Sequence, residues 1–205
     1  MSFLFLGFFT GLSLILAIGA QNIFVIEQGL KKQYVFIVCL ICSISDLLLI
    51  FLGIFLFQYF SQYFNQTVEL IFNILLLIFL AYFIFSKIYA KKKKIDFKKQ
   101  KKNLSLKSII FKTLAFTYLN PHVYSDTVFF LGNFSKNFLI EQKYYFGIGA
   151  SIASFLFFFT LGYLSKYLSV YIKSHNIWRK INIFIISFMS FIALFVLIEI
   201  LNYFK

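Results

Sequence analysis

The sequence predicts an all-α integral membrane protein with six transmembrane helices, arranged as two inverted three-helix repeats in which spans one and four are interrupted. Of its 205 residues, 61% are hydrophobic and 13% are charged, whereas soluble domains carry about 25% charged residues. Its apolar segments are about 20 residues long, the length that crosses a bilayer. The first and fourth of these segments also contain residues that break helices.

Charged or polar clusters separate the expected spans. The first half, residues 1–89, and the second half, residues 108–205, contain three spans each, and a lysine-rich loop, residues 90–107, joins the halves. The spans are 3–26, 35–58, 68–89, 108–131, 144–168 and 177–203.

The basic residues predict the orientation. Of the 20 Lys and Arg residues, 17 lie in the first, third and fifth loops, and such an excess marks cytoplasmic loops. We therefore expect both termini outside and the lysine-rich loop in the cytoplasm. A five-span alternative, with segment 3–26 only partly inserted, places the N-terminus inside. Because the loop anchors the topology, the net charge of +13 does not predict a nucleic-acid partner.

Two helix breaks occupy matching places in the two halves. Gly19, followed by Gln21 and Asn22, interrupts the first span. Asn120 and Pro121 interrupt the fourth, because proline removes a backbone hydrogen bond and disfavours helical geometry at the residue before it. Interrupted segments in corresponding positions of inverted halves indicate the binding site of a transporter.

Asp46 lies in the middle of the second predicted span and Asp126 beyond the break in the fourth, and no Lys or Arg lies deep in any span. A carboxylate at a helix centre costs about 2.5–3.5 kcal/mol on insertion scales. The pair is therefore expected to be protonated or to face water and a cationic ligand. His122 precedes Asp126 by four residues on one helical face, where it can relay a proton. Tyr124 shares a face with Asn120 and is expected to line the same cavity.

A divalent metal exporter is the alternative. Cys39, Cys42 and Asp46 form one stripe of the second span and, with His122 and Asp126, supply thiolate, carboxylate and imidazole ligands. A membrane thiol–disulfide carrier is disfavoured, because both cysteines lie in span two. No catalytic motif or cofactor fingerprint is present, so neither an enzyme nor a bound cofactor is expected.

Two stretches resemble the lysine/arginine exporter (LysE) family: "GLSLILAIGAQNIFVIEQGLKKQYVFIVCLICSISDLLLI" (Gly11–Ile50) and "LNPHVYSDTVFFLG" (Leu119–Gly132). The resemblance implies export of basic amino acids, L-arginine and/or L-lysine, across the bacterial cytoplasmic (inner) membrane by proton-driven antiport. The family commonly has proline where this chain has Ala17, so the first break must depend on Gly19.

The predicted site combines these observations. Asp46 and Asp126 are expected to face the cationic side chain of the substrate, and the amide side chains to take its α-carboxylate. Protons are the expected coupling ion, no metal is expected, and self-association into a homo-oligomer is left open. The predicted site residues are Gln21, Asn22, Asp46, Asn120, Tyr124 and Asp126 for the substrate, His122 for the proton, and Gly19 and Pro121 for the breaks.

Overall fold

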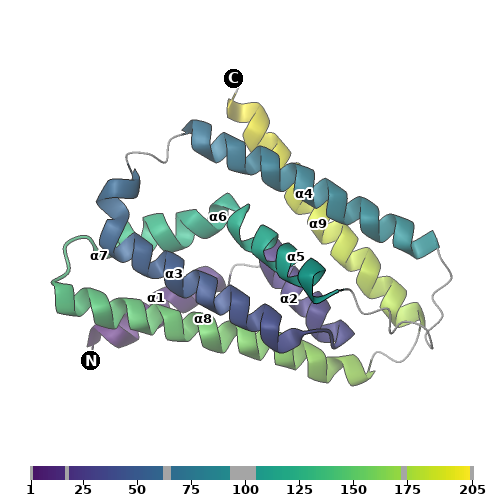
Figure 1. The fold of residues 1–205 in the computed structure, drawn as a ribbon, viewed down its shortest axis with the longest axis horizontal. Coiled ribbons are helices and arrows are strands. Elements are labelled where there is room, and N and C mark those ends of the chain that lie inside the picture. Colours follow the sequence, from purple (N-terminus) through teal and green to yellow (C-terminus); the bar gives the residue numbers. More distant parts are fainter. Residues whose placement is uncertain (1, 17–18, 62–65, 93–104, 172–174, 204–205) are drawn as a thin grey trace.

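The computed structural model describes residues 2–16, 19–61, 66–92, 105–171 and 175–203, and these residues form helices and turns without a strand (Figure 1). Ala17 and most of the lysine-rich loop lie outside the described residues. The elements are α1 (Ser2–Ile15), α2 (Ala20–Lys31), α3 (Val35–Ser61), α4 (Gln66–Lys92), α5 (Leu106–Tyr118), α6 (Pro121–Tyr124), the π-helix η1 (Ser125–Phe130), α7 (Leu131–Ser135), α8 (Ile140–Leu168), the 3₁₀ turn η2 (Ser169–Tyr171) and α9 (His175–Tyr203).

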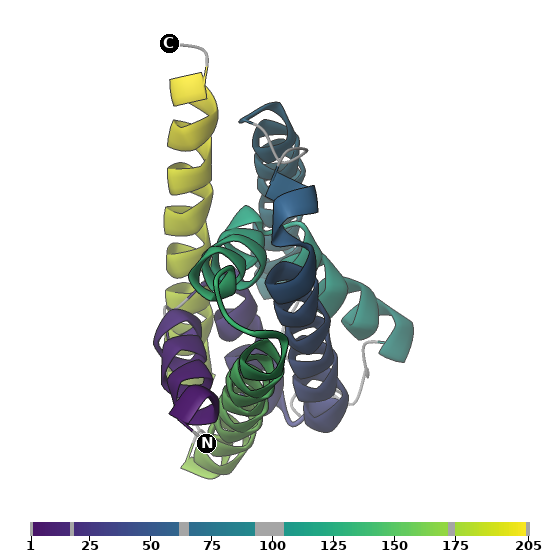
Figure 2. The ribbon, with the colours of Figure 1, turned by 90° about the vertical axis from the view of Figure 1, so that its left-hand side faces the viewer.

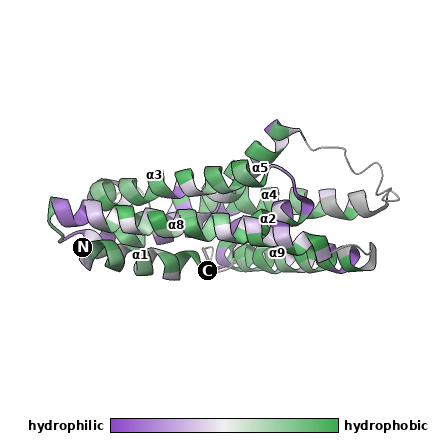
Figure 3. Ribbon diagram, turned by 90° about the horizontal axis from the view of Figure 1, so that it is seen from below, coloured by the Kyte–Doolittle hydropathy of each residue, from purple (hydrophilic) through white to green (hydrophobic). Residues whose placement is uncertain are grey.

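Four helices are long and apolar enough to cross a membrane: α3, α4, α8 and α9. They coincide with the second, third, fifth and sixth predicted spans. Helices α1 and α2 qualify only as a pair, with a bend of 83° between them. The fourth predicted span, 108–131, is not one helix, because α5, α6, η1 and α7 follow one another across it. Figure 3 shows hydrophobic residues along most of the length of the long helices, as a lipid-facing surface requires.

The long helices pair in antiparallel fashion. Cys39, near the start of α3, contacts Gly162 near the end of α8, whereas Ile54, further along α3, contacts Gly147 near the start of α8. Helices α4 and α9 lie side by side in Figures 1 and 2. The hydroxyl groups of Thr67, at the start of α4, and Tyr203, at the end of α9, are 3.2 Å apart.

Glycines allow two parallel helix contacts. Gly7 and Gly11 place α1 directly on the backbone of α8 at Phe146 and Ala150. Gly53 likewise places α3 directly on the backbone of η1 at Val128. Small residues permit this close approach, and dispersion contacts between the backbones stabilise it inside a membrane. Each broken segment is therefore held against one long helix.

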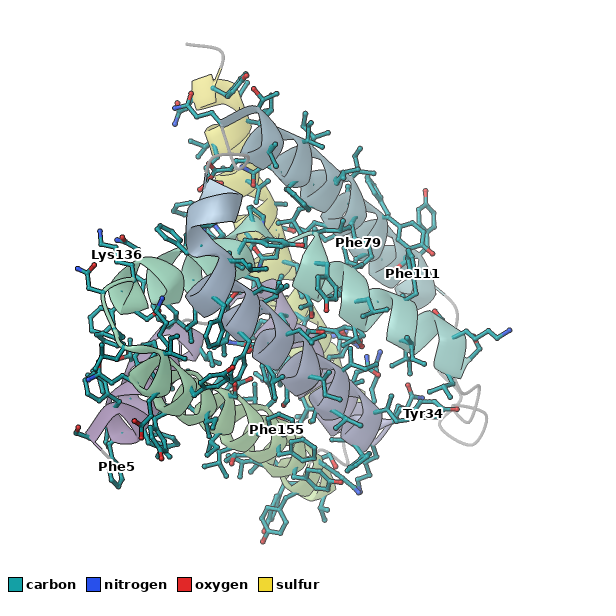
Figure 4. The ribbon with its side chains drawn as sticks, turned by 60° about the vertical axis from the view of Figure 1, so that its left-hand side comes forward. Phe5, Tyr34, Phe79, Phe111, Lys136 and Phe155 are labelled. Atoms are coloured by element: carbon teal, nitrogen blue, oxygen red, sulfur yellow. The ribbon has the colours of Figure 1, made fainter. Side chains whose placement is uncertain are left out.

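An aromatic cluster joins α2, α4 and α5. The ring of Phe116 on α5 lies 5.0 Å from that of Phe24, 4.7 Å from that of Phe79 and 5.1 Å from that of Phe83, between centroids. Figure 4 shows Phe79 between α4 and α5, whereas Phe111 on α5 points outward. Burial of these rings fixes α2 against α5, and so brings the regions of the two breaks together.

We predict that Gly149→Ala destabilises the protein by about 1–3 kcal/mol, the usual cost of overpacking. A methyl group at this position would overlap the backbone carbonyl oxygen of Leu4. Gly147→Ala is the matched control, because its methyl group would meet only the side-chain ends of Ile54 and Phe51, at 3.0 Å or more. Thermal unfolding of the purified proteins in detergent measures the difference. Equal melting temperatures for the two variants would contradict the close contact between α1 and α8.

Candidate substrate cavity

A cavity of about 430 Å³ lies where the two helix breaks meet. This volume falls within the range of about 300–1,000 Å³ for small-molecule sites. Residues from both breaks border it, together with residues of α3, η1, α8 and α9. Of the predicted site residues, the cavity is bordered by Gly19, Gln21, Asn22, Asp46, Asn120, His122 and Asp126.

At the first break, α1 ends at Ile15 and α2 begins at Ala20. Gly19 stands before α2 with extended backbone (φ −109°, ψ −176°), and no side chain caps the helix. The first N–H groups of a helix have no partner within it. On the other side of the break, the side-chain amide of Asn22 donates to the backbone carbonyl of Ile15 at 3.2 Å. Asn22 thus closes over the carbonyl group at the end of α1, and Gly19, which has no side chain, gives α2 no side-chain cap.

At the second break, α5 ends at Tyr118 and α6 begins at Pro121. Asn120 caps α6, because its side-chain oxygen accepts from the backbone N–H of His122 at 3.2 Å. The hydroxyl of Tyr124 donates to the backbone carbonyl of Tyr118 at 2.9 Å, across the break. The structure therefore places Tyr124 as a support of the break. Its ring packs on Phe72, and it is not among the described residues that border the cavity.

The two breaks lie beside one another. A Cβ atom built on Gly19 would be 4.0 Å from the side-chain nitrogen of Asn120. Three amide side chains, those of Gln21, Asn22 and Asn120, border the cavity, and each is at least nine-tenths buried. The side-chain nitrogen of Gln21 has no hydrogen-bond partner among the described residues.

Asp46 and Asp126 border the same cavity from α3 and η1. Asp46 is 3% exposed, and one of its carboxylate oxygens accepts from the hydroxyl of Ser154 on α8 at 2.8 Å. Asp126 lies in the first turn of the π-helix, an irregular element often found at functional sites. Among the described residues that border the cavity there is no Lys or Arg. Ionisable residues inside a membrane usually face a cavity or a partner, and these two carboxylates face the cavity.

His122 borders the cavity and also faces Glu199 on α9. Its Nε2 atom lies 3.8 Å from a carboxylate oxygen of Glu199, which is within reach of an ion pair when the imidazole is protonated. The sequence analysis did not single out Glu199. The sequence could have indicated this residue, because Glu199 is an acidic residue inside the apolar run of the sixth predicted span.

Part of the cavity wall is aromatic. Phe188, Phe191 and Phe195 follow one face of α9, and Phe158 of α8 borders the cavity as well. Phenyl faces attract a guanidinium or ammonium group within about 6 Å of the ring centroid. The wall therefore suits a ligand with an aliphatic stem and a cationic end.

The metal-exporter alternative finds no support. Among the described residues, no group of three or more His, Cys, Asp or Glu side chains is arranged to hold a metal ion. The thiol of Cys39 donates to the backbone carbonyl of Phe158 at 3.2 Å, and both cysteines are buried and free. Neither Cys39 nor Cys42 is among the described residues that border the cavity. The two thiols thus lie in the packed interior, whereas Asp46 of the same stripe borders the cavity.

The fold and the cavity describe a helical membrane protein with an acidic site at two helix breaks. The chain belongs to the LysE type translocator family, whose sequence profile matches residues 12–200. It is similar to the arginine exporter protein ArgO of Pectobacterium atrosepticum (36% identity over 92% of this chain and 93% of the relative) and of Escherichia coli K12 (34%, 94% and 92%). It is also similar to ArgO of Klebsiella pneumoniae strain 342 (32%, 94% and 92%). No solved structure matches the chain.

We predict that Ser154→Ala destabilises the protein by about 1–3 kcal/mol, because it leaves a buried oxygen of Asp46 without its donor. Ser151→Ala is the matched control one turn away. The Ser151 hydroxyl is buried without a partner among the described residues, so its loss should be neutral or stabilising. Thermal unfolding in detergent compares the two variants. A Ser154→Ala protein as stable as Ser151→Ala would argue against the hydrogen bond to Asp46.

Proposed function

We propose that this protein exports basic amino acids, L-arginine and/or L-lysine, across the bacterial inner membrane. The observation that carries the proposal is the acidic cavity between the breaks, where Asp46 and Asp126 have no Lys or Arg beside them among the described residues. The names of the relatives, which are arginine exporter proteins, support the same substrate class.

The substrate binds with its two ends in different surroundings. Its cationic side chain lies toward Asp46, Asp126 and the phenyl rings of α9. Its α-carboxylate accepts from the first N–H groups of α2, where the helix dipole favours negative charge. The amides of Gln21, Asn22 and Asn120 complete this end of the site. Tyr124 contributes by holding the second break in place.

The six spans form two inverted repeats, and the packing of the helices supports this arrangement. Helices α3 and α8 are antiparallel, as are α4 and α9. In addition, α1 packs in parallel on α8, and η1 with α7 packs in parallel on α3, both through glycines. The broken segment of each half thus rests on the second span of the other half. The excess of basic residues places the lysine-rich loop in the cytoplasm.

Export is coupled to proton entry. An inside-negative potential opposes outward movement of a cation by about 2.3 kcal/mol per charge per 100 mV. A proton that enters in exchange offsets this cost. Asp46 and Asp126 exchange a proton for the substrate cation, and His122, which faces both the cavity and Glu199, relays that proton.

We predict that Asp46→Asn and Asp126→Asn each reduce arginine export about tenfold or more, since a lost charge-assisted contact costs about 1.5–3 kcal/mol. Efflux of labelled arginine and lysine from cells loaded with dipeptides measures the effect, with membrane insertion checked by immunoblot. Glu141→Gln, an exposed acid at the start of α8, is the control and should export normally. Normal export by Asp46→Asn would remove this carboxylate from the mechanism.

We also predict that efflux from proteoliposomes accelerates when the receiving side is made more acidic, because inward proton movement then drives export. The external pH is lowered at constant internal pH, and a protonophore serves as the control that should abolish the acceleration. Arginine efflux at the same rate with and without the gradient would rule out proton antiport.

A further inference from the structure

A second cavity, of about 350 Å³, lies between the start of α4 and the end of α9. This end of α4 is opposite the end that leads to the lysine-rich loop, about 40 Å along a helix of 27 residues. In Figure 1 this end of α4 lies beside the end of α9, near the C-terminus. The cavity is bordered by Gln66, Glu69, Leu70, Asn73, Glu199, Asn202 and Tyr203.

Two buried acceptor atoms of this cavity lack a donor among the described residues. Asn73 is 4% exposed, and its side-chain oxygen has no hydrogen-bond partner among the described residues. One carboxylate oxygen of Glu199 is likewise buried without a partner, and Glu69 adds a second carboxylate. No Lys or Arg is among the described residues that border the cavity. A ligand with several N–H donors and a positive charge would satisfy these acceptors.

The two cavities follow one another along the same helices. On α9, Val196 borders the first cavity and Glu199, one turn later, borders the second. On α4, Leu76 borders the first cavity and Asn73, one turn earlier, borders the second. His122 borders the first cavity and lies 3.8 Å from Glu199. Glu199 therefore faces His122 with one oxygen and leaves the other for the second cavity.

We propose that the second cavity is an exit site, which binds the guanidinium or ammonium group of the substrate after it leaves the first cavity. The proposal rests on the proposed export of basic amino acids and on the outward orientation of this end of α4. Glu69 and Glu199 hold the cation, and Asn73 accepts a further hydrogen bond from it. His122, between the two cavities, marks the path from one to the other.

The test uses labelled agmatine, which carries the guanidinium group of arginine but no carboxylate. Its equilibrium binding is measured on purified protein in lipid nanodiscs, in an Asp46→Asn, Asp126→Asn background that lacks the acids of the first cavity. Saturable binding should remain in this background. Adding Glu69→Gln with Glu199→Gln should weaken it about tenfold or more, as expected for the loss of charge-assisted hydrogen bonds. Adding Glu141→Gln should leave it unchanged.

A loss of binding in the multiple variant could also come from misfolding, so a variant that is expected to bind more tightly is tested as well. Asn73→Asp adds a third carboxylate to the cavity and should tighten agmatine binding severalfold, which an unfolded protein cannot do. Two results would overturn the exit site: no saturable agmatine binding in the background variant, or equal binding with Glu69→Gln, Glu199→Gln and with Glu141→Gln. The wild-type efflux assay separates this from failure of the proposed function, since an exporter without an exit site still exports arginine.

Discussion

The structure depends on how the backbone hydrogen bonds are satisfied at two helix breaks inside an apolar bundle. Lipid offers no partner to a free N–H or carbonyl group, so broken helices persist only where protein or a polar cavity supplies one. Asn22 serves the carbonyl of Ile15, and Tyr124 serves that of Tyr118. The remaining groups at the start of α2 adjoin the cavity. The breaks and the cavity therefore require one another.

Packing turns these two local breaks into one site. Glycines lay α1 on α8 and η1 on α3, and the aromatic cluster around Phe116 holds α2 against α5. The breaks consequently meet at Gly19 and Asn120, and α3 brings Asp46 to the same place. Along α9 the aromatic residues of the first cavity are followed by Glu199, which borders the second. The proposed path of the cation follows this order of surfaces.

The sequence predicted those parts of the fold and the site that have local signals. Long apolar runs predicted α3, α4, α8 and α9, and the residues Gly19 and Pro121 stand where α2 and α6 begin. Contacts between distant segments have no such signal. The bond from Ser154 to Asp46 and the approach of His122 to Glu199 depend on how helices pair, and the π-helix shifts the register after Tyr124. Tyr124 points to the break rather than to the cavity, and its hydroxyl donates to the backbone carbonyl of Tyr118.

The central claim is that both breaks hold one substrate in one cavity. A structure determined by electron cryo-microscopy in lipid with bound L-arginine tests it most directly. We predict density for one arginine in the cavity, with its guanidinium group against Asp46 and Asp126 and its carboxylate against the first turn of α2. Arginine bound away from these residues, or helix breaks separated by packed side chains, would contradict the claim.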